Sequence, residues 1–249
     1  MKSVETPVPA VLIQDLSKYL DGKQVLFGIN LSIPAGEVFG FLGPNGAGKT
    51  TTMKAILGLI RPDSGAVSIF GDTTLSNETK GKIGFMPENT YLYKYLTGRE
   101  FLRFNGKFFQ IPEAELNVRI EEILRKVGLD TAGDKLLGKY SKGMLQRIGL
   151  GQAIINEPSI VFLDEPMSGL DPIGRKMVKD LILELKSKGT TVFFNTHILS
   201  DVESICDAFA IIHQGHLVAN DLVKNLEKPL EEYFIERIHE NTEGRLEVR

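Results

Sequence analysis

Hydrophobic and polar residues follow two different periods along this chain. Short apolar runs that end in polar turn residues predict strands, and the first region of this kind is 11–33. There Asp21-Gly22-Lys23 separates two runs, which predicts a pair of antiparallel strands. From about 97 to 155 the period is mostly helical instead. The residues that form one apolar helical face in that stretch are Leu116, Ile120, Ile123, Leu124 and Val127.

Strands and helices alternate in the second half of the chain. The elements predicted there are a strand at 159–163, a helix at 175–188, a strand at 190–195, a helix after residue 197, a hairpin at 209–218 and a partly helical tail at 230–249. Strands that alternate with helices form mostly parallel sheets. The pattern therefore predicts an α/β fold that carries a helical insertion.

Composition narrows the class of protein. The 249 residues suffice for one large domain or a domain with a subdomain, and 42% hydrophobic with 24% charged residues is typical of soluble globular proteins. A net charge of −3 gives no basic excess for binding nucleic acid. The single cysteine, Cys206, excludes an internal disulfide and fits a reducing compartment. Since no apolar run approaches the roughly 18 residues of a membrane span, we expect any membrane-spanning part to come from another chain.

Residues 43–50, Gly-Pro-Asn-Gly-Ala-Gly-Lys-Thr, match the phosphate-binding pattern G-x-x-x-x-G-K-[ST] at every fixed position. The apolar run 37–42 before them predicts a buried strand, and 51–59 after them predicts a helix. Such a helix start presents bare backbone N–H groups and about half a positive charge. This arrangement suits a triphosphate, and we expect ATP with Mg²⁺ as the ligand.

Each position of this loop has an expected task. Gly46 and Gly48 allow the backbone to approach the anion, Lys49 reaches the β- and γ-phosphates, and the Thr50 hydroxyl binds Mg²⁺. The residues predicted to bind the nucleotide here are Asn45, Gly46, Ala47, Gly48, Lys49, Thr50 and Thr51.

Two more predicted strands end in side chains that can act on a phosphate. The apolar run 160–163 leads into Asp164 and Glu165. We expect Asp164 to hold Mg²⁺, through water, and Glu165 to orient or deprotonate the attacking water. His197 follows the other strand and, while neutral, can donate to a γ-phosphate oxygen. A solvated Asp-Glu turn and a structural histidine are the alternative interpretations.

Three further motifs make the set resemble a known family. Residues 140–147, Tyr-Ser-Lys-Gly-Met-Leu-Gln-Arg, resemble the signature motif of the nucleotide-binding subunits of ATP-binding-cassette (ABC) transporters. Residues 168–171 and Thr196-His197 resemble the family's loop after the Asp-Glu pair and its switch histidine. The match runs from about 11 to 226. It implies a P-loop NTPase core with a mostly parallel sheet, an N-terminal antiparallel β subdomain, a helical subdomain at about 88–157 and a separate helical tail at 227–249.

The resemblance also implies how ATP is held. Two chains, most simply two identical ones, pair head to tail, and each ATP lies between one phosphate loop and the signature of the other chain. Ser141 and Gly143 are then the residues that face the γ-phosphate. ATP binding closes the pair, and hydrolysis removes the phosphate that bridged it.

The chain departs from the family pattern at three places. Lys142 stands at a glycine-rich position of the signature, and Met144 stands where glutamine is common. Glu88 replaces a glutamine; because a carboxylate also binds Mg²⁺ or water, we keep it as a metal and catalytic residue. The slot for the aromatic residue that stacks on adenine holds Leu20, with Tyr19 beside it. Tyr19 either stacks on adenine or is a surface residue of an edge strand.

The signature and the other family motifs of this chain resemble most those of a subgroup that drives exporters with separately encoded membrane subunits. The leading hypothesis is therefore an ATPase that lies on the cytoplasmic face of the membrane, bound to a polytopic permease. The expected contact residues are Tyr91, Leu92, Tyr93 and Tyr95, because aromatic residues are enriched at buried interfaces. Alternatively, these residues pack inside the helical insertion.

Two other functions remain as alternatives. Related cassettes act as soluble clamps on nucleic acid or ribosomes, but this chain has one phosphate loop, no sustained heptads and no basic tract. We therefore expect no nucleic-acid partner. A cassette that binds ATP without hydrolysing it is the other alternative, and the presence of Glu165 argues against it.

Overall fold

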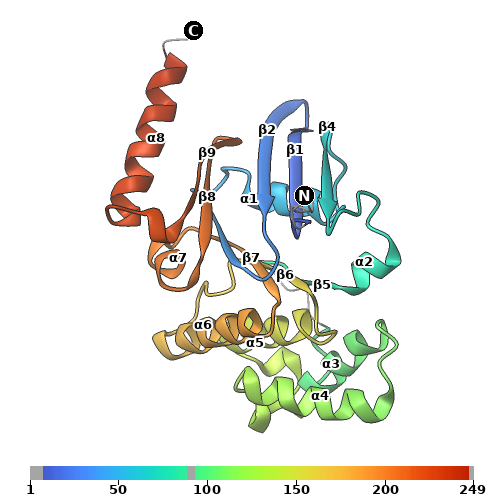
Figure 1. Ribbon diagram of the computed structural model, residues 1–249. Coiled ribbons are helices and arrows are strands. Elements are labelled where there is room, and N and C mark those ends of the chain that lie inside the picture. The colour runs from blue at the N-terminus through green and yellow to red at the C-terminus, as the bar shows by residue number, and fades with distance from the viewer. Residues whose placement is uncertain (1–7, 89–92, 247–249) are drawn as a thin grey trace, which may run out of the picture. The chain divides into compact units, whose positions relative to one another are not determined.

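The computed structural model describes residues 8–88 and 93–246, and they fall into two compact units (Figure 1). The first unit comprises Met1–Thr79 and Asn195–Arg249, and the second comprises Lys80–Phe194.

An antiparallel sheet of three strands, in the order β2-β1-β4, lies in the first unit. Its strands are β1 (Val11–Leu20), β2 (Lys23–Ile33) and β4 (Ser64–Ile69). Asp21 and Gly22 join β1 to β2 with φ of 49° and 77°, the left-handed values that a tight hairpin turn requires. The antiparallel pair predicted at 11–33 is confirmed.

The phosphate-loop segment of the first unit is built on a buried strand. All residues of β3 (Val38–Leu42) are buried, and β3 pairs in parallel with β8 (Ala208–His213). β8 turns at Gln214-Gly215 and pairs with β9 (His216–Leu222), as the predicted hairpin requires. Helix α1 (Lys49–Ile56) follows the loop. It ends three residues earlier than the predicted end at residue 59, because Gly58 has a left-handed φ of 66°.

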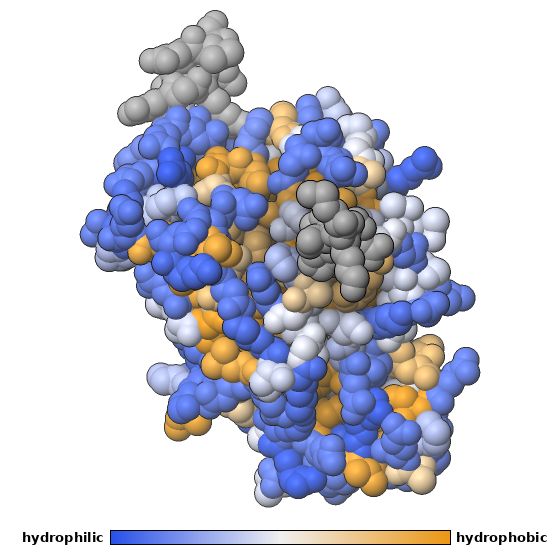
Figure 2. Space-filling view, viewed as in Figure 1, coloured by the Kyte–Doolittle hydropathy of each residue, from blue (hydrophilic) through white to orange (hydrophobic). Residues whose placement is uncertain are grey.

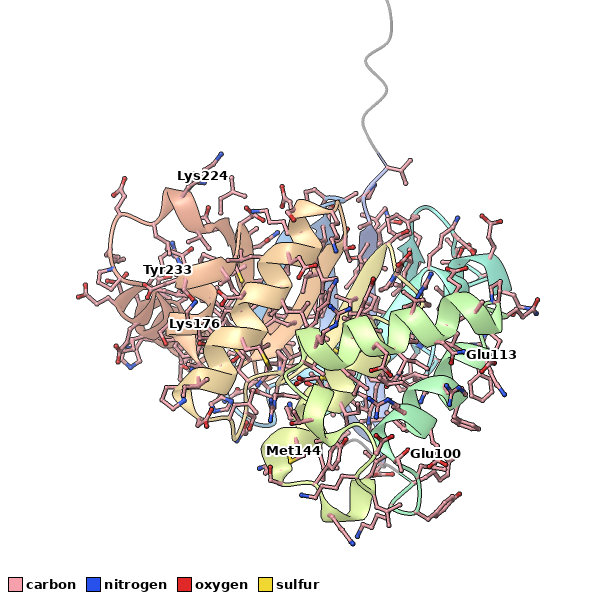
Figure 3. The ribbon with its side chains drawn as sticks, turned by 90° about the horizontal axis from the view of Figure 1, so that it is seen from below. Glu100, Glu113, Met144, Lys176, Lys224 and Tyr233 are labelled. Atoms are coloured by element: carbon pink, nitrogen blue, oxygen red, sulfur yellow. The ribbon has the colours of Figure 1, made fainter. Side chains whose placement is uncertain are left out.

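The remaining helices of the first unit pack beside this hairpin. Helix α7 (Leu199–Ile205) precedes β8 in the chain. The short helix η3 (Val223–Asn225) and the long helix α8 (Leu230–Leu246) follow β9. The ring of Tyr233, labelled in Figure 3, meets the Phe209 ring of β8 edge-on with centroids 5.8 Å apart. The buried Leu230 donates its N–H to the Glu203 carboxylate. The chain also forms α2 (Asn77–Gly81), which is too short for periodicity to predict.

Strands of the second unit are neighbours in the order β5-β6-β7. β5 (Ile83–Met86) pairs in parallel with β6 (Ile160–Asp164), and β6 and β7 (Thr191–Thr196) are buried throughout. Helix α6 (Pro172–Ser187) starts three residues before the predicted 175, because the Asp171 side chain accepts a hydrogen bond from the Gly174 N–H and proline suits a first helical position.

The helical stretch predicted at 97–155 is present in the second unit. It comprises α3 (Gly98–Lys107), α4 (Glu113–Lys126), η1 (Asp130–Ala132), η2 (Leu137–Lys139) and α5 (Lys142–Ala153). The five residues predicted as one apolar face are all buried. A capping box starts α3: the Thr97 hydroxyl accepts from the Glu100 N–H, and the Glu100 carboxylate accepts from the Thr97 N–H.

These elements confirm the predicted fold class, an α/β P-loop core with parallel strand pairs, an antiparallel β part and a helical insertion. The exact boundaries of the subdomain at 88–157 and of the tail at 227–249 remain predictions. In the part of the chain that the structure describes, we find no helix that combines the length and the apolar character needed to cross a bilayer.

Candidate active site

The phosphate loop joins β3 to α1 through a tight, glycine-dependent turn. Gly46 and Gly48 have φ of 77° and 113°, and a Cβ atom at Gly43 would lie 2.3 Å from the Ile212 carbonyl oxygen. Gly48 is the N-cap of α1 and has no side chain to cap it. The first N–H groups of α1 therefore point to the loop without a side-chain acceptor from the capping residue, which suits an anion.

Lys49 curls back over this loop. Its Nζ donates to the carbonyl oxygens of Gly43, at 2.7 Å, and Pro44, at 3.2 Å, and only 6% of the residue is exposed. Thr50 follows in the first turn of α1 and is half-buried. One ammonium, one hydroxyl and several N–H groups thus converge at one helix start, and this donor set fits the phosphates of ATP and a magnesium ion.

A second loop supports the phosphate loop from behind. The Gly215 N–H at the tip of the β8–β9 hairpin donates to the Ala47 carbonyl, and the Phe27 N–H of β2 donates to the Gly215 carbonyl, both at 2.9 Å. The Phe27 ring stacks on His216 with centroids 4.2 Å apart. These contacts hold the phosphate loop between β2 and the hairpin, and the sequence pattern alone did not indicate them.

Tyr19 and Leu20 end β1, where its pairing with β2 is irregular. A register shift between Lys18 and Tyr19 brings Tyr19 opposite Gln24, and Leu20 opposite Lys23. Both side chains are exposed, Tyr19 to 49% and Leu20 to 40%. Further along β2, the Leu26 side chain lies against Gly48 of the phosphate loop.

Tyr19 is held in this register by Asp63. The Asp63 carboxylate accepts the Tyr19 N–H at 2.6 Å and forms an ion pair with Lys18 at 3.0 Å. Both contacts, the Tyr19 N–H first, hold the pKa of Asp63 below its usual value. The anchored backbone leaves the Tyr19 side chain exposed.

His197 also belongs to the first unit, directly after β7. It is exposed, and the chain turns there because the Thr196 hydroxyl accepts the Ile198 N–H at 3.0 Å. Two residues earlier, the buried Asn195 amide contacts the Met53 sulfur of α1 at 3.8 Å. The structure thus ties the end of β7 to the helix that starts at the phosphate loop.

In the second unit, Asp164 and Glu165 lie at the end of β6. Both are buried, with 2% and 8% exposed. Glu165 has a φ of 51°, a left-handed conformation that few residues other than glycine adopt. The Gln146 side chain of α5 fixes this turn by donating to the Glu165 carbonyl at 2.8 Å. Strained residues of this kind concentrate at functional sites.

The signature residues form the start of α5 in the same unit. Ser141 is the N-cap, and its hydroxyl accepts the Met144 N–H (Figure 3). A Cβ atom at Gly143 would lie 3.3 Å from the Leu170 side chain, so this helix start packs closely on the loop 168–171. The Tyr140 hydroxyl donates to the Ala132 carbonyl at 2.8 Å, and burial raises the pKa of Tyr140.

Comparison with known proteins identifies the family. The family model described as ABC transporter matches residues 26–168, which is more than half of the chain. The chain belongs to the ABC transporter family.

Individual relatives agree with this assignment. An uncharacterized ABC transporter ATP-binding protein of a Nostoc species is 51% identical over 81% of this chain and 61% of its own length. The bacitracin transport ATP-binding protein BcrA of Bacillus licheniformis is 40% identical over 88% of this chain and 72% of its own length. A solved ATP-binding subunit of an ABC transporter superposes with a TM-score of 0.85 and 32% identity, covering 92% of this chain and 99% of that one. This ABC chain therefore spans about six tenths of the Nostoc relative.

The family and the P-loop fold predicted from the motifs are thus confirmed, and the predicted enzyme class, ATPase, is the class of ABC ATP-binding subunits. The first unit of this ABC chain contains the phosphate loop, Tyr19 and His197. The second contains Asp164, Glu165, Glu88 and the signature. The roles of these residues remain predictions. Among the described residues, no group of three or more His, Cys, Asp and Glu side chains is arranged to hold a metal ion.

Glu88, Tyr93 and Tyr95 lie on the surface of the second unit. Tyr91 and Leu92, which were also predicted as contact residues, lie outside the described residues. Tyr93 and Tyr95 are exposed, and Figure 2 shows hydrophobic side chains gathered over α3 and α4. A row of ring contacts, with centroids 5.1–5.8 Å apart, joins Tyr95, Tyr93, Phe104 and Phe108. The sequence analysis missed the two phenylalanines, although their spacing of four residues could have placed them together.

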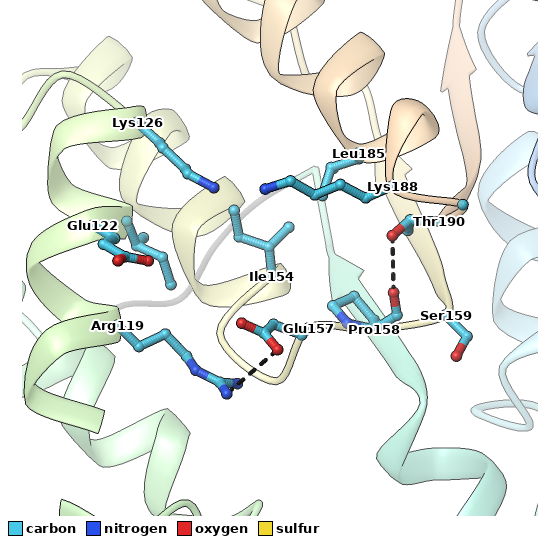
Figure 4. A pocket seen from close by; sticks show the side chains of 12 residues that line it. Arg119, Glu122, Lys126, Ile154, Glu157, Pro158, Ser159, Leu185, Lys188 and Thr190 are labelled. Atoms are coloured by element: carbon cyan, nitrogen blue, oxygen red, sulfur yellow. Dashed lines mark hydrogen bonds and ion pairs between the residues drawn. The ribbon is translucent and has the colours of Figure 1, made fainter. Parts of the chain in front are cut away.

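A cavity of about 440 Å³ lies elsewhere in the second unit, between α4, α6 and the segment before β6 (Figure 4). Its three cationic side chains are bonded within the protein. Arg119 pairs with Glu157, and Lys126 and Lys188 both donate to Glu184, whose pKa they lower. Since these charges are already paired, we assign no ligand to this cavity.

Proposed function

We propose that this chain is the ATP-binding and ATP-hydrolysing subunit of a membrane exporter. The observation that carries the proposal is that an ABC chain presents two helix starts suited to phosphate, α1 after the phosphate loop and α5 at the signature. One relative is named for bacitracin transport, which supports a transport role.

The phosphate loop of the first unit would hold the nucleotide. The N–H groups from Asn45 to Thr51 and the Lys49 ammonium bind the phosphate oxygens, and the Thr50 hydroxyl and Asp164 hold the metal, with Glu88 as a further ligand. The magnesium ion, when bound, neutralises charge on the phosphates. The Tyr19 ring, of which 49% is exposed, would stack on adenine.

Glu165 would orient the attacking water and accept its proton, because its backbone is fixed by Gln146 and its carboxylate is buried. A positioned base of this kind supplies about 10²–10⁴ in rate. His197, while neutral, would donate to a γ-phosphate oxygen and so distinguish ATP from ADP.

A second copy of the chain would complete each site. Ser141 is exposed and Gly143 is half-buried at the start of α5, which packs closely on the loop 168–171. Paired head to tail, each copy would offer this helix start to the γ-phosphate held by the other. Hydrolysis would remove the bridging phosphate and open the pair.

The membrane partner would dock on the aromatic row of the second unit, and the chain would lie on the cytoplasmic face of the membrane. Exposed rings that contact one another in tilted and edge-on arrangements favour a protein interface. We expect Tyr93→Ala to reduce the membrane-bound fraction of the chain while ATP binding is unchanged, because Tyr93 is exposed and lies at the centre of the row. Unchanged recovery with membranes would reject this contact.

The transport proposal is tested by isolating a stalled complex. Tagged Glu165→Gln, which should bind ATP without hydrolysing it, is purified from native membranes, and the associated proteins are identified by mass spectrometry. A polytopic membrane protein in stoichiometric amount is the expected result. Recovery of ribosomes, or of soluble partners alone, would contradict an exporter subunit.

A further inference from the structure

Lys142 is the residue of the signature whose role the proposed function leaves open. It begins α5 and is exposed. It also lies in an unusually cationic stretch: from Lys135 to Asn156 the chain has four Lys and Arg residues and no Asp or Glu, although its net charge is −3. The stretch therefore concentrates positive potential at the start of α5.

The position of Lys142 is unfavourable for the helix itself. A helix N-terminus is already partly positive, so a cation there is repelled, and the first turn of α5 contains no acidic residue to offset it. The other cation of this helix start, Arg147, donates to the carbonyls of Val127 and Gly128. For Lys142, the described part of the chain provides no ion pair with a carboxylate. An anion from outside the chain would relieve this repulsion.

The Lys142 side chain lies along a neighbouring loop of its own unit. A Cβ atom at Gly169 would lie 3.1–3.3 Å from Cε, Nζ and Cδ of Lys142, so the end of the side chain runs along Gly169. Gly169 has a φ of 71°, a conformation that favours glycine, and the absence of a side chain there makes room for the lysine. The ammonium is thus kept beside the loop on which Gly143 also packs.

We propose that Lys142 is a phosphate-binding residue that acts in trans, with its ammonium on the triphosphate held by the phosphate loop of a second copy. This inference rests on the head-to-tail pairing in the proposed function. It adds a full charge to the neutral donors of Ser141 and Gly143. Pairing should then be favoured by ATP over ADP and should weaken with salt.

The test measures ATP-driven pairing by sedimentation of the Glu165→Gln chain with magnesium, at low and at physiological salt. Adding Lys142→Gln should raise the ATP concentration for half-maximal pairing about tenfold at low salt and flatten its salt dependence. Lys142→Arg, which keeps the charge, should pair like the parent. Lys139→Gln removes a lysine from the same stretch outside α5 and is the matched control, expected to change neither quantity.

Two further readouts separate the possible outcomes. ATP binding to the unpaired chain should be equal in all variants, and thermal unfolding of Lys142→Gln should not be lowered, because the variant removes a repelled cation. If Lys142→Gln pairs at the same ATP concentration and with the same salt dependence, this inference alone is wrong. If the Glu165→Gln chain itself does not pair with ATP, the proposed function is wrong and this inference with it.

Discussion

The starts of α1 and α5 are both partly positive and suited to phosphate, but they differ in how they are covered. α1 begins at Gly48, has no capping side chain and is covered by its own lysine, of which 6% is exposed. α5 begins at Ser141, which caps it, and its lysine is exposed on the surface. The phosphate loop is thus a cradle whose lysine is buried within its own unit, whereas the signature presents its serine and lysine on the surface.

Packing explains the difference. The phosphate loop is held from behind by β2 and the β8–β9 hairpin, and a side chain at Gly43 would collide with the backbone there. The signature is supported by the loop 168–171 and by the Arg147 and Gln146 hydrogen bonds, all within its own unit. A cradle can bind a ligand alone; an open helix start needs a second surface opposite it. Changes in the two regions should therefore affect different steps.

The largest expected effect is on ATP binding to the single chain. Lys49→Ala removes an ammonium that lies inside the phosphate loop, and we expect affinity for ATP to fall about a hundredfold, since contacts to charged phosphate oxygens are strong. The affinity is measured by titration with a fluorescent ATP analogue, at a protein concentration too low for two chains to pair. Lys142→Ala, the matched change at the other helix start, should leave this affinity unchanged. An equal loss of ATP affinity in both variants would contradict the distinction between the phosphate loop and the exposed signature.

A smaller effect is expected on the stability of the first unit. Gly43→Ala would place Cβ 2.3 Å from the Ile212 carbonyl oxygen, and we expect this overpacking to cost about 2 kcal/mol. Urea unfolding measures the loss. Gly81→Ala, where a Cβ meets nothing within 4 Å, is the control and should change the free energy of unfolding by about 0.5 kcal/mol or less. Equal stabilities of the two variants would contradict the close packing behind the loop.

The smallest expected effect comes from the signature cap. Ser141→Ala removes the acceptor for the Met144 N–H and should cost about 1 kcal/mol of stability. ATP binding to the single chain should be unchanged, while ATP-driven pairing should need more ATP. A fall in single-chain ATP affinity would mean that Ser141 serves its own phosphate loop.

Much of the fold followed from periodicity, and the rest depended on contacts between distant residues. The strand pair at 11–33, the hairpin at Gln214-Gly215 and the buried face of α4 were predictable because each follows from local pattern. The early start of α6 could have been found from Asp171-Pro172, an N-cap followed by proline. α2 was too short to give a period.

The candidate site was predictable in its motifs and not in its supports. Spacing alone pointed to the phosphate loop and to the signature. It could not show the left-handed backbone of Glu165, which depends on Gln146, or the bond between Gly215 and Ala47, residues far apart in sequence. It also could not show the register shift between Lys18 and Tyr19, because such an irregularity depends on how β1 pairs with β2.

The central claim is that one ATP is held by the phosphate loop of one copy and the signature of another. The direct test mixes two defective chains: Lys49→Ala, with an intact signature, and Gly143→Asp, whose carboxylate would repel the γ-phosphate. Each chain alone should hydrolyse almost no ATP, and the mixture should regain about a quarter of the wild-type rate, since half of the random pairs contain one intact composite site. ATP should also drive the association of the two differently tagged chains. A mixture no more active than its two components, with no such association, would contradict the account.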